Sequence, residues 1–220
     1  MDPAPPDWRF LLPVDEKSRV LELAGRDDVA LAFAYEIAQV VALRDSFDAG
    51  ERLTATAASA GLSNVDLLLG TLEEPPGLDG LFQAIVLHDA LDQPWRPPSA
   101  PGADERLLGT LRRALAPSGA LWIAARNHAF GPRGAEGLQR VLRRAGFAAL
   151  EIWALLPNAE RPLELVPLDS PSAFDFVTDR GQIGGRGTWA TALAKRAFRA
   201  GLAPRFIPAF GIVARAGGPR

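Results

Sequence analysis

Two pairs of polar residues in this sequence could carry acid–base chemistry. His88 and Asp89 follow one apolar run, and Asn127 and His128 follow another. A histidine beside a carboxylate can act as a general base, because its ordinary pKa lies near neutrality. Neighbouring residues of an extended strand point to opposite faces, so His88 and Asp89 can serve one substrate only if the chain turns between them. The alternative is a strand-end histidine whose hydrogen bonds are satisfied within the protein.

Several other kinds of chemistry are excluded by what the chain lacks. There is no cysteine, so disulfides, thiolate metal ligands and a cysteine nucleophile are absent. Two histidines without a carboxylate at ligand spacing predict no metal site. No Gly-x-Ser-x-Gly elbow of a hydrolase occurs. The glycine-rich run 181–187 lacks the lysine and the serine or threonine of a phosphate-binding loop, and we interpret it as a hinge.

The apolar pattern predicts an α/β scaffold to position these residues. Apolar strands without alternation that are separated by helices are typical of a parallel sheet covered on both faces. With right-handed crossovers, we expect a doubly wound, mostly parallel, seven-stranded sheet. We expect Asp27 or Asp28 to be the N-cap of the first helix. The predicted strands are 19–23, 40–43, 65–69, 82–87, 121–124, 149–155 and 206–214, and the predicted helices are 29–37, 49–60, 104–115, 134–145 and 188–200.

Length and composition predict a single domain over residues 1–220. The chain is 48% hydrophobic and 23% charged, which suits one buried core. Residues 157–187 hold a series of prolines and then glycines, and we interpret them as a lid or insertion before the last strand. Residues 1–8 are acidic and proline-rich, so we expect a flexible N-terminus. Neither a signal peptide nor an apolar run of ~20 residues occurs, so we expect a cytoplasmic protein without an integral membrane segment.

Charge is distributed unevenly along the chain. Residues 1–110 carry 8 Lys+Arg and 19 Asp+Glu, a net charge of −11. Residues 111–220 carry 16 Lys+Arg and 7 Asp+Glu, a net charge of +9. The two halves could interleave and neutralise each other, or a basic face could meet an anionic substrate, a membrane or a partner. Lys195 and Arg199 share one face of the helix at 188–200, which is either an ordinary amphipathic helix or a docking surface. The acidic pI of about 5.8 predicts no nucleic-acid binding.

Several segments between residues 8 and 215 resemble class I S-adenosylmethionine-dependent methyltransferases. The resemblance implies a Rossmann-like methyltransferase fold and S-adenosylmethionine as the cofactor. A weaker likeness at 156–158 and 161–169 is to methyltransferases found alongside glycan or natural-product biosynthesis. The segments that carry the main resemblance are 19–25 at the first strand and glycine loop, 108–119 at the helix and turn before strand five, 121–127 at strand five, and 138–147 at the helix and turn before strand six.

The glycine loop departs from the pattern of this family. Small residues there let the backbone approach the methionine part of the cofactor. Glu22 supplies the acid that the family has before the glycines. Ala24, Arg26 and Asp28 stand where glycines are expected, and Gly25 is out of step with them. Arg26 could instead contact the cofactor carboxylate.

Two further cofactor positions also depart from the family pattern. Arg44 replaces the acid that ends strand two and holds the ribose hydroxyls, and Asp45 follows one residue later. Asp45 could serve if the strand end bulges; otherwise it is a loop carboxylate or a helix cap. Thr71 stands where an acid near the adenine is expected. We therefore expect binding of S-adenosylmethionine to be weakened or absent.

Three functional hypotheses follow. The first is a non-catalytic pseudoenzyme that acts with a protein partner, or as a homo-oligomer, in a glycan or natural-product pathway. The second is an active methyltransferase with a divergent loop, acting on a small molecule or glycan. The third is an anionic ligand, such as a nucleotide or sugar phosphate, held by Arg26, Arg44 and Arg126. For the second, the cofactor would contact Glu22, Gly25, Asp45 and Thr71, and the acceptor would be oriented by His88, Asp89, Asn127 or His128.

The loop at 24–28 can discriminate among these hypotheses. An open cavity above the loop would favour ligand binding. A cavity filled by Arg26, or by the segment 157–187, would favour a non-enzymatic role.

Overall fold

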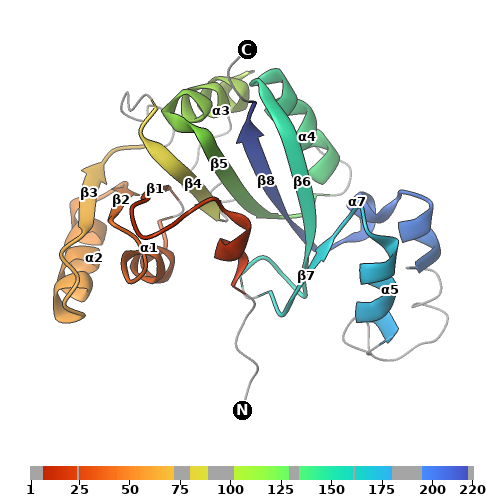
Figure 1. Ribbon diagram of the computed structural model, residues 1–220, viewed down its shortest axis with the longest axis horizontal. Helices are drawn as coiled ribbons and strands as arrows, with labels where there is room; N and C mark the ends of the chain where they lie inside the picture. Colours follow the sequence, from red (N-terminus) through yellow and green to blue (C-terminus); the bar gives the residue numbers. More distant parts are fainter. Residues whose placement is uncertain are drawn as a thin grey trace.

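An eight-stranded sheet forms the centre of the protein, with the strand order β3-β2-β1-β4-β5-β8-β6-β7 (Figure 1). The computed structural model describes residues 7–23, 25–71, 80–88, 102–128, 134–160, 162–179 and 195–217. The strands are β1 (Arg19–Glu22), β2 (Gln39–Arg44), β3 (Val65–Leu69), β4 (Phe82–His88), β5 (Leu115–Arg126), β6 (Phe147–Leu156), β7 (Glu164–Pro167) and β8 (Ala209–Ala216). The helices are η1 (Trp8–Leu11), α1 (Asp27–Ala34), α2 (Phe47–Ser59), α3 (Ala103–Ala114), α4 (Ala135–Arg144), α5 (Pro171–Asp179) and α7 (Ala203–Phe206).

The sheet is mostly parallel, as the sequence predicts. Strands β3, β2, β1, β4 and β5 pair in parallel, while β8 lies antiparallel between β5 and β6. The count of seven strands is wrong by one, because β7 adds an antiparallel edge strand to β6. This strand lies inside the segment 157–187 and ends at Pro167. Proline is tolerated on an edge strand, because one side of such a strand needs no backbone donors.

Several predicted element boundaries also need correction. Arg26 is the N-cap of α1, so Asp27 and Asp28 lie in its first turn instead of capping it. Carboxylates are favourable there, because the N-terminal end of a helix is partly positive. The last strand begins at Ala209, since Phe206 ends the short helix α7. Of the predicted helix 188–200, residues 195–199 are helical and 188–194 lie outside the described residues.

Two apolar cores cover the two faces of the sheet, which explains why the strands do not alternate in hydrophobicity. Val20 and Leu21 are neighbours in β1, and both are buried, on opposite faces. On one face η1, α1 and α2 pack against the sheet; on the other lie α3, α4 and α5 (Figure 1). Gly211 of β8 leaves the space that the ring of Trp122 fills.

The carboxyl ends of the parallel strands lie along one edge of the sheet. This edge carries Glu22 at the end of β1, Arg44 at the end of β2, His88 at the end of β4 and Arg126 at the end of β5. Ligands of open α/β sheets bind at this edge. The fold therefore brings most of the polar residues singled out in the sequence to one place.

Candidate functional site

A buried ion pair joins the ends of β1 and β2. The Nη1 atom of Arg44 lies 2.6 Å from Oε2 of Glu22, and both side chains are almost fully buried. The Nη2 atom of Arg44 lies 3.0 Å from Oδ1 of Asp27, in the first turn of α1. Nη1 also donates to the carbonyl of Leu43, at 2.8 Å. The guanidinium is thus directed inward, between two carboxylates.

The electrostatics of this cluster keep Arg44 charged. Burial opposes the charged guanidinium, but the attraction of Glu22 and the hydrogen bonds to Glu22 and Asp27 outweigh it, so the pKa of Arg44 is raised. The backbone N–H of Arg26 also donates to Oε1 of Glu22, at 3.4 Å. Both carboxylate oxygens of Glu22 are therefore occupied by groups of the protein itself.

The loop between β1 and α1 is also engaged. Gly25 has a φ of +67°, a left-handed conformation in which glycine carries no steric cost. The guanidinium of Arg26 pairs with Asp28 at 2.6 Å and donates to the carbonyl of Glu160 at 3.5 Å. The loop is thereby joined to the segment 157–187. Ala24, a predicted cofactor contact, lies outside the described residues.

His88 is buried beneath the N-terminal helix. Its Nε2 lies 2.7 Å from the carbonyl oxygen of Ala159; since a carbonyl only accepts, Nε2 carries the proton. Its Nδ1 is buried and has no hydrogen-bond partner in the described part of the chain. The ring stacks on Trp8 at 5.4 Å, and Trp8 stacks on Trp122 at 4.9 Å. Trp8 belongs to the N-terminal stretch predicted to be flexible, yet its side chain is 9% exposed.

The surroundings of His88 make it a weak base. Burial and the nearby positive charge of Arg26 lower its pKa to about 4. The ring is therefore neutral at physiological pH. General-base catalysis is most effective when the pKa of the base lies near the working pH. His88 is suited to accept a hydrogen bond at Nδ1 more than to remove a proton.

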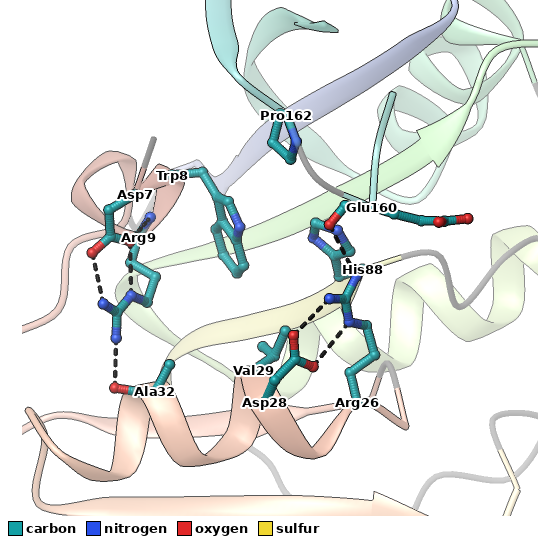
Figure 2. A pocket seen from close by; sticks show the side chains of 10 residues that line it. All are labelled: Asp7, Trp8, Arg9, Arg26, Asp28, Val29, Ala32, His88, Glu160 and Pro162. Carbon is teal, nitrogen blue, oxygen red and sulfur yellow. Dashed lines mark hydrogen bonds and ion pairs between the residues drawn. The ribbon is translucent and has the colours of Figure 1, made fainter. Parts of the chain in front are cut away.

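A cavity of about 270 Å³ lies beside His88, between η1, the start of α1, Glu160 and Pro162. Figure 2 shows two arginine–aspartate pairs at this cavity, Asp7 with Arg9 and Asp28 with Arg26, with Trp8 between them. The first pair is held at 2.6 Å, and Arg9 also reaches Glu36 at 3.1 Å. The cavity is thus small and lined by charged groups that already have partners.

The remaining predicted residues do not gather at this cavity. Asn127 donates from Nδ2 to the carbonyls of Pro204 and Ile207, at 2.7 and 2.8 Å, and accepts from the backbone N–H of Ala135 at 3.3 Å. This side chain ties the end of β5 to the start of α4, to α7 and to the residue that follows α7. The side chains of Asp45, Thr71 and His128 are exposed, and Asp89 lies outside the described residues.

The three arginines of the anionic-ligand hypothesis all have carboxylate partners. Because each positive charge is already paired, none is a ready contact for a phosphate. The ion pairs are Arg26 with Asp28, Arg44 with Glu22, and Arg126 with Glu160 at 2.7 Å. The sequence reasoning missed Asp27, Trp8 and Glu160. An arginine that ends an otherwise apolar strand was the available signal for a nearby carboxylate such as Asp27.

Within the described ranges, no group of three potential metal ligands occurs. Among the helices of the same ranges, none has the length and apolar composition that crossing a membrane requires.

Sheet order and layers define the class of fold. Helices on both faces of a mostly parallel sheet, with one antiparallel strand between β5 and β6, form a methyltransferase-like, Rossmann-like architecture. Solved structures similar to this chain include many S-adenosylmethionine-dependent methyltransferases, which agrees with the resemblance found in the sequence. No family model and no curated protein matches the sequence.

Three of the similar solved structures are a cyclase and two methyltransferases. The cyclase SpnF is 19% identical, with a TM-score of 0.61 over 96% of this chain and 79% of its own. The complex between the Haloferax volcanii Trm112 methyltransferase activator and a methyltransferase contains a chain that is 17% identical to this one. Its TM-score is 0.57, over 95% of this chain and 86% of its own. Haemonchus contortus phosphoethanolamine N-methyltransferase 2, solved with S-adenosyl-L-methionine, is 12% identical. Its TM-score is 0.61, over 98% of this chain and 54% of its own. Identities this low show the fold alone.

Proposed function

We propose that this protein keeps the methyltransferase fold but does not transfer methyl groups. In this proposal it is a regulatory or structural partner of another protein in a glycan or natural-product pathway. The observation that carries the proposal is the buried ion pair between Glu22 and Arg44, which Asp27 extends. It stands at two positions through which the related methyltransferases would hold the cofactor.

The energy of this ion pair bears directly on cofactor affinity. A ligand amine or hydroxyl that used Glu22 would have to displace the guanidinium of Arg44. Removing one partner of a buried ion pair costs about 3–5 kcal/mol. At 1.4 kcal/mol for each factor of ten, this cost weakens binding by roughly two to more than three powers of ten. A cofactor whose dissociation constant is otherwise micromolar would then have a roughly millimolar one.

The contacts of the neighbouring segment support the same proposal. Arg26 reaches the carbonyl of Glu160, and His88 donates to the carbonyl of Ala159. The first bond holds Glu160 against the loop that would admit the methionine part of the cofactor, and the second holds Ala159 against the end of β4. An opening of this edge would have to break them together with the ion pair.

A partner role is consistent with what is known of the fold. One of the similar structures is the complex of a methyltransferase with its Trm112 activator, and another is a cyclase. The fold is thus found in proteins with other tasks than methyl transfer alone. The weak likeness at 156–158 and 161–169 is our ground for naming a biosynthetic pathway.

Isothermal titration calorimetry with S-adenosylmethionine and S-adenosylhomocysteine tests the proposal. We expect no dissociation constant tighter than about 0.1 mM for either compound. The variant E22Q/R44M removes the ion pair without leaving a charge. It is the control for a cofactor site that is otherwise intact and blocked only by the ion pair. A micromolar dissociation constant for the natural chain would overturn the proposal.

The cavity beside His88 favours one alternative, an active methyltransferase with a divergent loop. Its volume of about 270 Å³ would admit part of a small acceptor next to His88, whose Nδ1 has no hydrogen-bond partner among the described residues. In that case Gly25, Asp45 and Thr71 would contact the cofactor together with Glu22. Asp45→Ala would then lower product formation at least tenfold, and an unchanged rate would remove this assignment of the ribose contact.

A further inference from the structure

The helix η1 and the residues beside it are joined to the rest of the protein by side chains. We call residues 7–14 the strap. Among the described residues, every backbone–backbone hydrogen bond of the strap is made within the strap itself. These internal bonds run from the N–H groups of Phe10, Leu12 and Val14 to the carbonyls of Asp7, Arg9 and Leu12. The strap can therefore leave the sheet without breaking a hydrogen bond between the described strands.

A tight turn fixes the point at which the strap ends. The Oγ atom of Ser18 donates to Oδ1 of Asp15 at 2.7 Å and accepts from the backbone N–H of Asp15 at 2.8 Å. Ser18 is 2% exposed, and its carbonyl accepts from the N–H of Gln39 at the start of β2, at 3.4 Å. This turn is thus anchored to the sheet just before β1 begins, and the hinge of the strap lies between Val14 and Asp15.

Few contacts hold the strap in place. Trp8 and Leu12 are its two buried side chains, and the ring of Trp8 stacks on both His88 and Trp122. The guanidinium of Arg9 donates to the carbonyl of Ala32 and pairs with Glu36 at 3.1 Å. The carbonyl of Leu11 accepts from Arg215 at 3.5 Å. A segment with few buried contacts opens at a lower free energy than the whole fold.

The strap covers one side of the cavity beside His88. Asp7, Trp8 and Arg9 line this cavity (Figure 2), and Trp8 lies over the rings of His88 and Trp122, which are 2% and 0% exposed. We infer that the strap undocks as a unit while the sheet stays intact, and that undocking opens this cavity to solvent. A ligand or partner surface that is too large for about 270 Å³ reaches His88 only in the open form. The strap thereby controls access to this edge of the sheet.

This inference goes beyond the proposed function and does not depend on it. The ion pair of Glu22 and Arg44, with Asp27, is formed by β1, β2 and the first turn of α1. None of these elements belongs to the strap, so the ion pair is the same in the closed and the open form. Calorimetry with S-adenosylmethionine tests the ion pair, and the labelling experiment below uses no cofactor, so the two can fail separately.

Labelling of a single introduced cysteine with dithionitrobenzoate tests the inference, because the natural chain has no cysteine. L12C places the thiol in the strap, and L53C is the matched control, since Leu12 and Leu53 are buried leucines of the same apolar core. We expect L12C to react about a hundredfold faster than L53C without denaturant, with a weaker dependence on urea. Equal rates would overturn the inference, because the strap would then open only when the whole chain unfolds. A57C, a smaller change at another buried site of α2, replaces L53C if that variant does not fold.

Arg9→Gln tests whether the strap moves as a unit. The substitution removes contacts to α1 three residues away from Leu12, so we expect L12C to be labelled about fivefold faster and L53C at an unchanged rate. The control R52Q removes the same charge from an exposed site of α2 and should change neither rate. V29C places the thiol in the wall of the cavity, and R9Q should raise its rate by the same factor as that of L12C. Equal acceleration of L12C and L53C would overturn the separate motion of the strap, and an unchanged V29C would overturn the opening of the cavity.

Discussion

Substitution of Arg44 by methionine is the most direct test of the buried ion pair. Methionine has a similar length and no charge, so the main change is the loss of the guanidinium. Glu22 would remain fully buried, with the backbone N–H of Arg26 as a weak donor at 3.4 Å. Asp27 is 38% exposed and would be solvated by water. The cost of the substitution therefore falls on Glu22.

The expected loss in the free energy of unfolding is about 3–5 kcal/mol, the usual cost of leaving one buried charge unpaired. A domain of this size is stable by about 5–15 kcal/mol, so R44M should be severely destabilised. The double variant E22Q/R44M has no unpaired charge. Replacing both partners of such a pair is often neutral or stabilising, so the double variant should lie within about 1 kcal/mol of the natural chain.

Urea unfolding followed by tryptophan fluorescence measures these differences, because the chain has five tryptophans. Arg126→Met is the matched control: Arg126 pairs with Glu160 at 2.7 Å, but both side chains are more than half exposed. Its loss should cost at most about 1 kcal/mol. Two outcomes would show that the buried pair does not have the energy we assign to it. In the first, R44M loses no more free energy of unfolding than R126M does. In the second, E22Q/R44M loses as much free energy of unfolding as R44M. The double variant keeps the test valid if R44M fails to fold.

Three further predictions concern the surroundings of the site. The pKa of His88 is about 4 in the folded chain and 6.5 in the unfolded chain, so the unfolded chain binds more protons between these pH values. About 3 kcal/mol of the free energy of unfolding should therefore be lost as the pH falls from 6.5 to 4. Urea unfolding of the H88Q variant should not show this loss. Trp8→Ala should cost about 3 kcal/mol and move the His88 pKa towards 6.5 in an NMR titration; an unmoved pKa would mean that Trp8 does not shield the ring. Asn127→Ala should cost about 1–3 kcal/mol by unpairing two backbone carbonyls, and a stability equal to that of the natural chain would contradict its tying role.

The sequence predicts the layers of this fold well because its signal is local. A strand such as 82–87 is apolar apart from Gln83, which requires cover on both faces, and the observed β4 has both. The edge strand β7 escaped prediction because Pro162 precedes it and Pro167 ends it, and proline is compatible with a loop as well as with an edge strand. The cap of α1 was misplaced by one or two residues, since Arg26 is not a usual capping residue and its side chain forms no capping hydrogen bond.

The site could be predicted only as a set of positions. The departure of Arg44 from the family pattern is visible in the sequence, but the direction of its side chain is not. Glu22 and Arg44 are brought together by the register of β1 on β2, which pairs Glu22 with Ala42. Apolar strands of four to six residues permit several registers of parallel pairing, and the sequence alone does not choose among them. The contacts of Trp8 and Glu160 depend on how two loops cross the sheet edge, for which no periodic pattern exists.

Under the proposed function, the ion pair explains why position 22 is an acid although no cofactor would contact it. Arg44 is buried and needs a counter-charge, and Glu22 is buried and needs the same. Substitution of either residue alone leaves an unpaired buried charge, at a cost of about 3–5 kcal/mol. Restoring an acid at position 44 would be worse, because it would face both Glu22 and Asp27. Under the proposed function, a change to the cofactor pattern therefore needs at least two coordinated substitutions, because each single one leaves a buried charge without its partner.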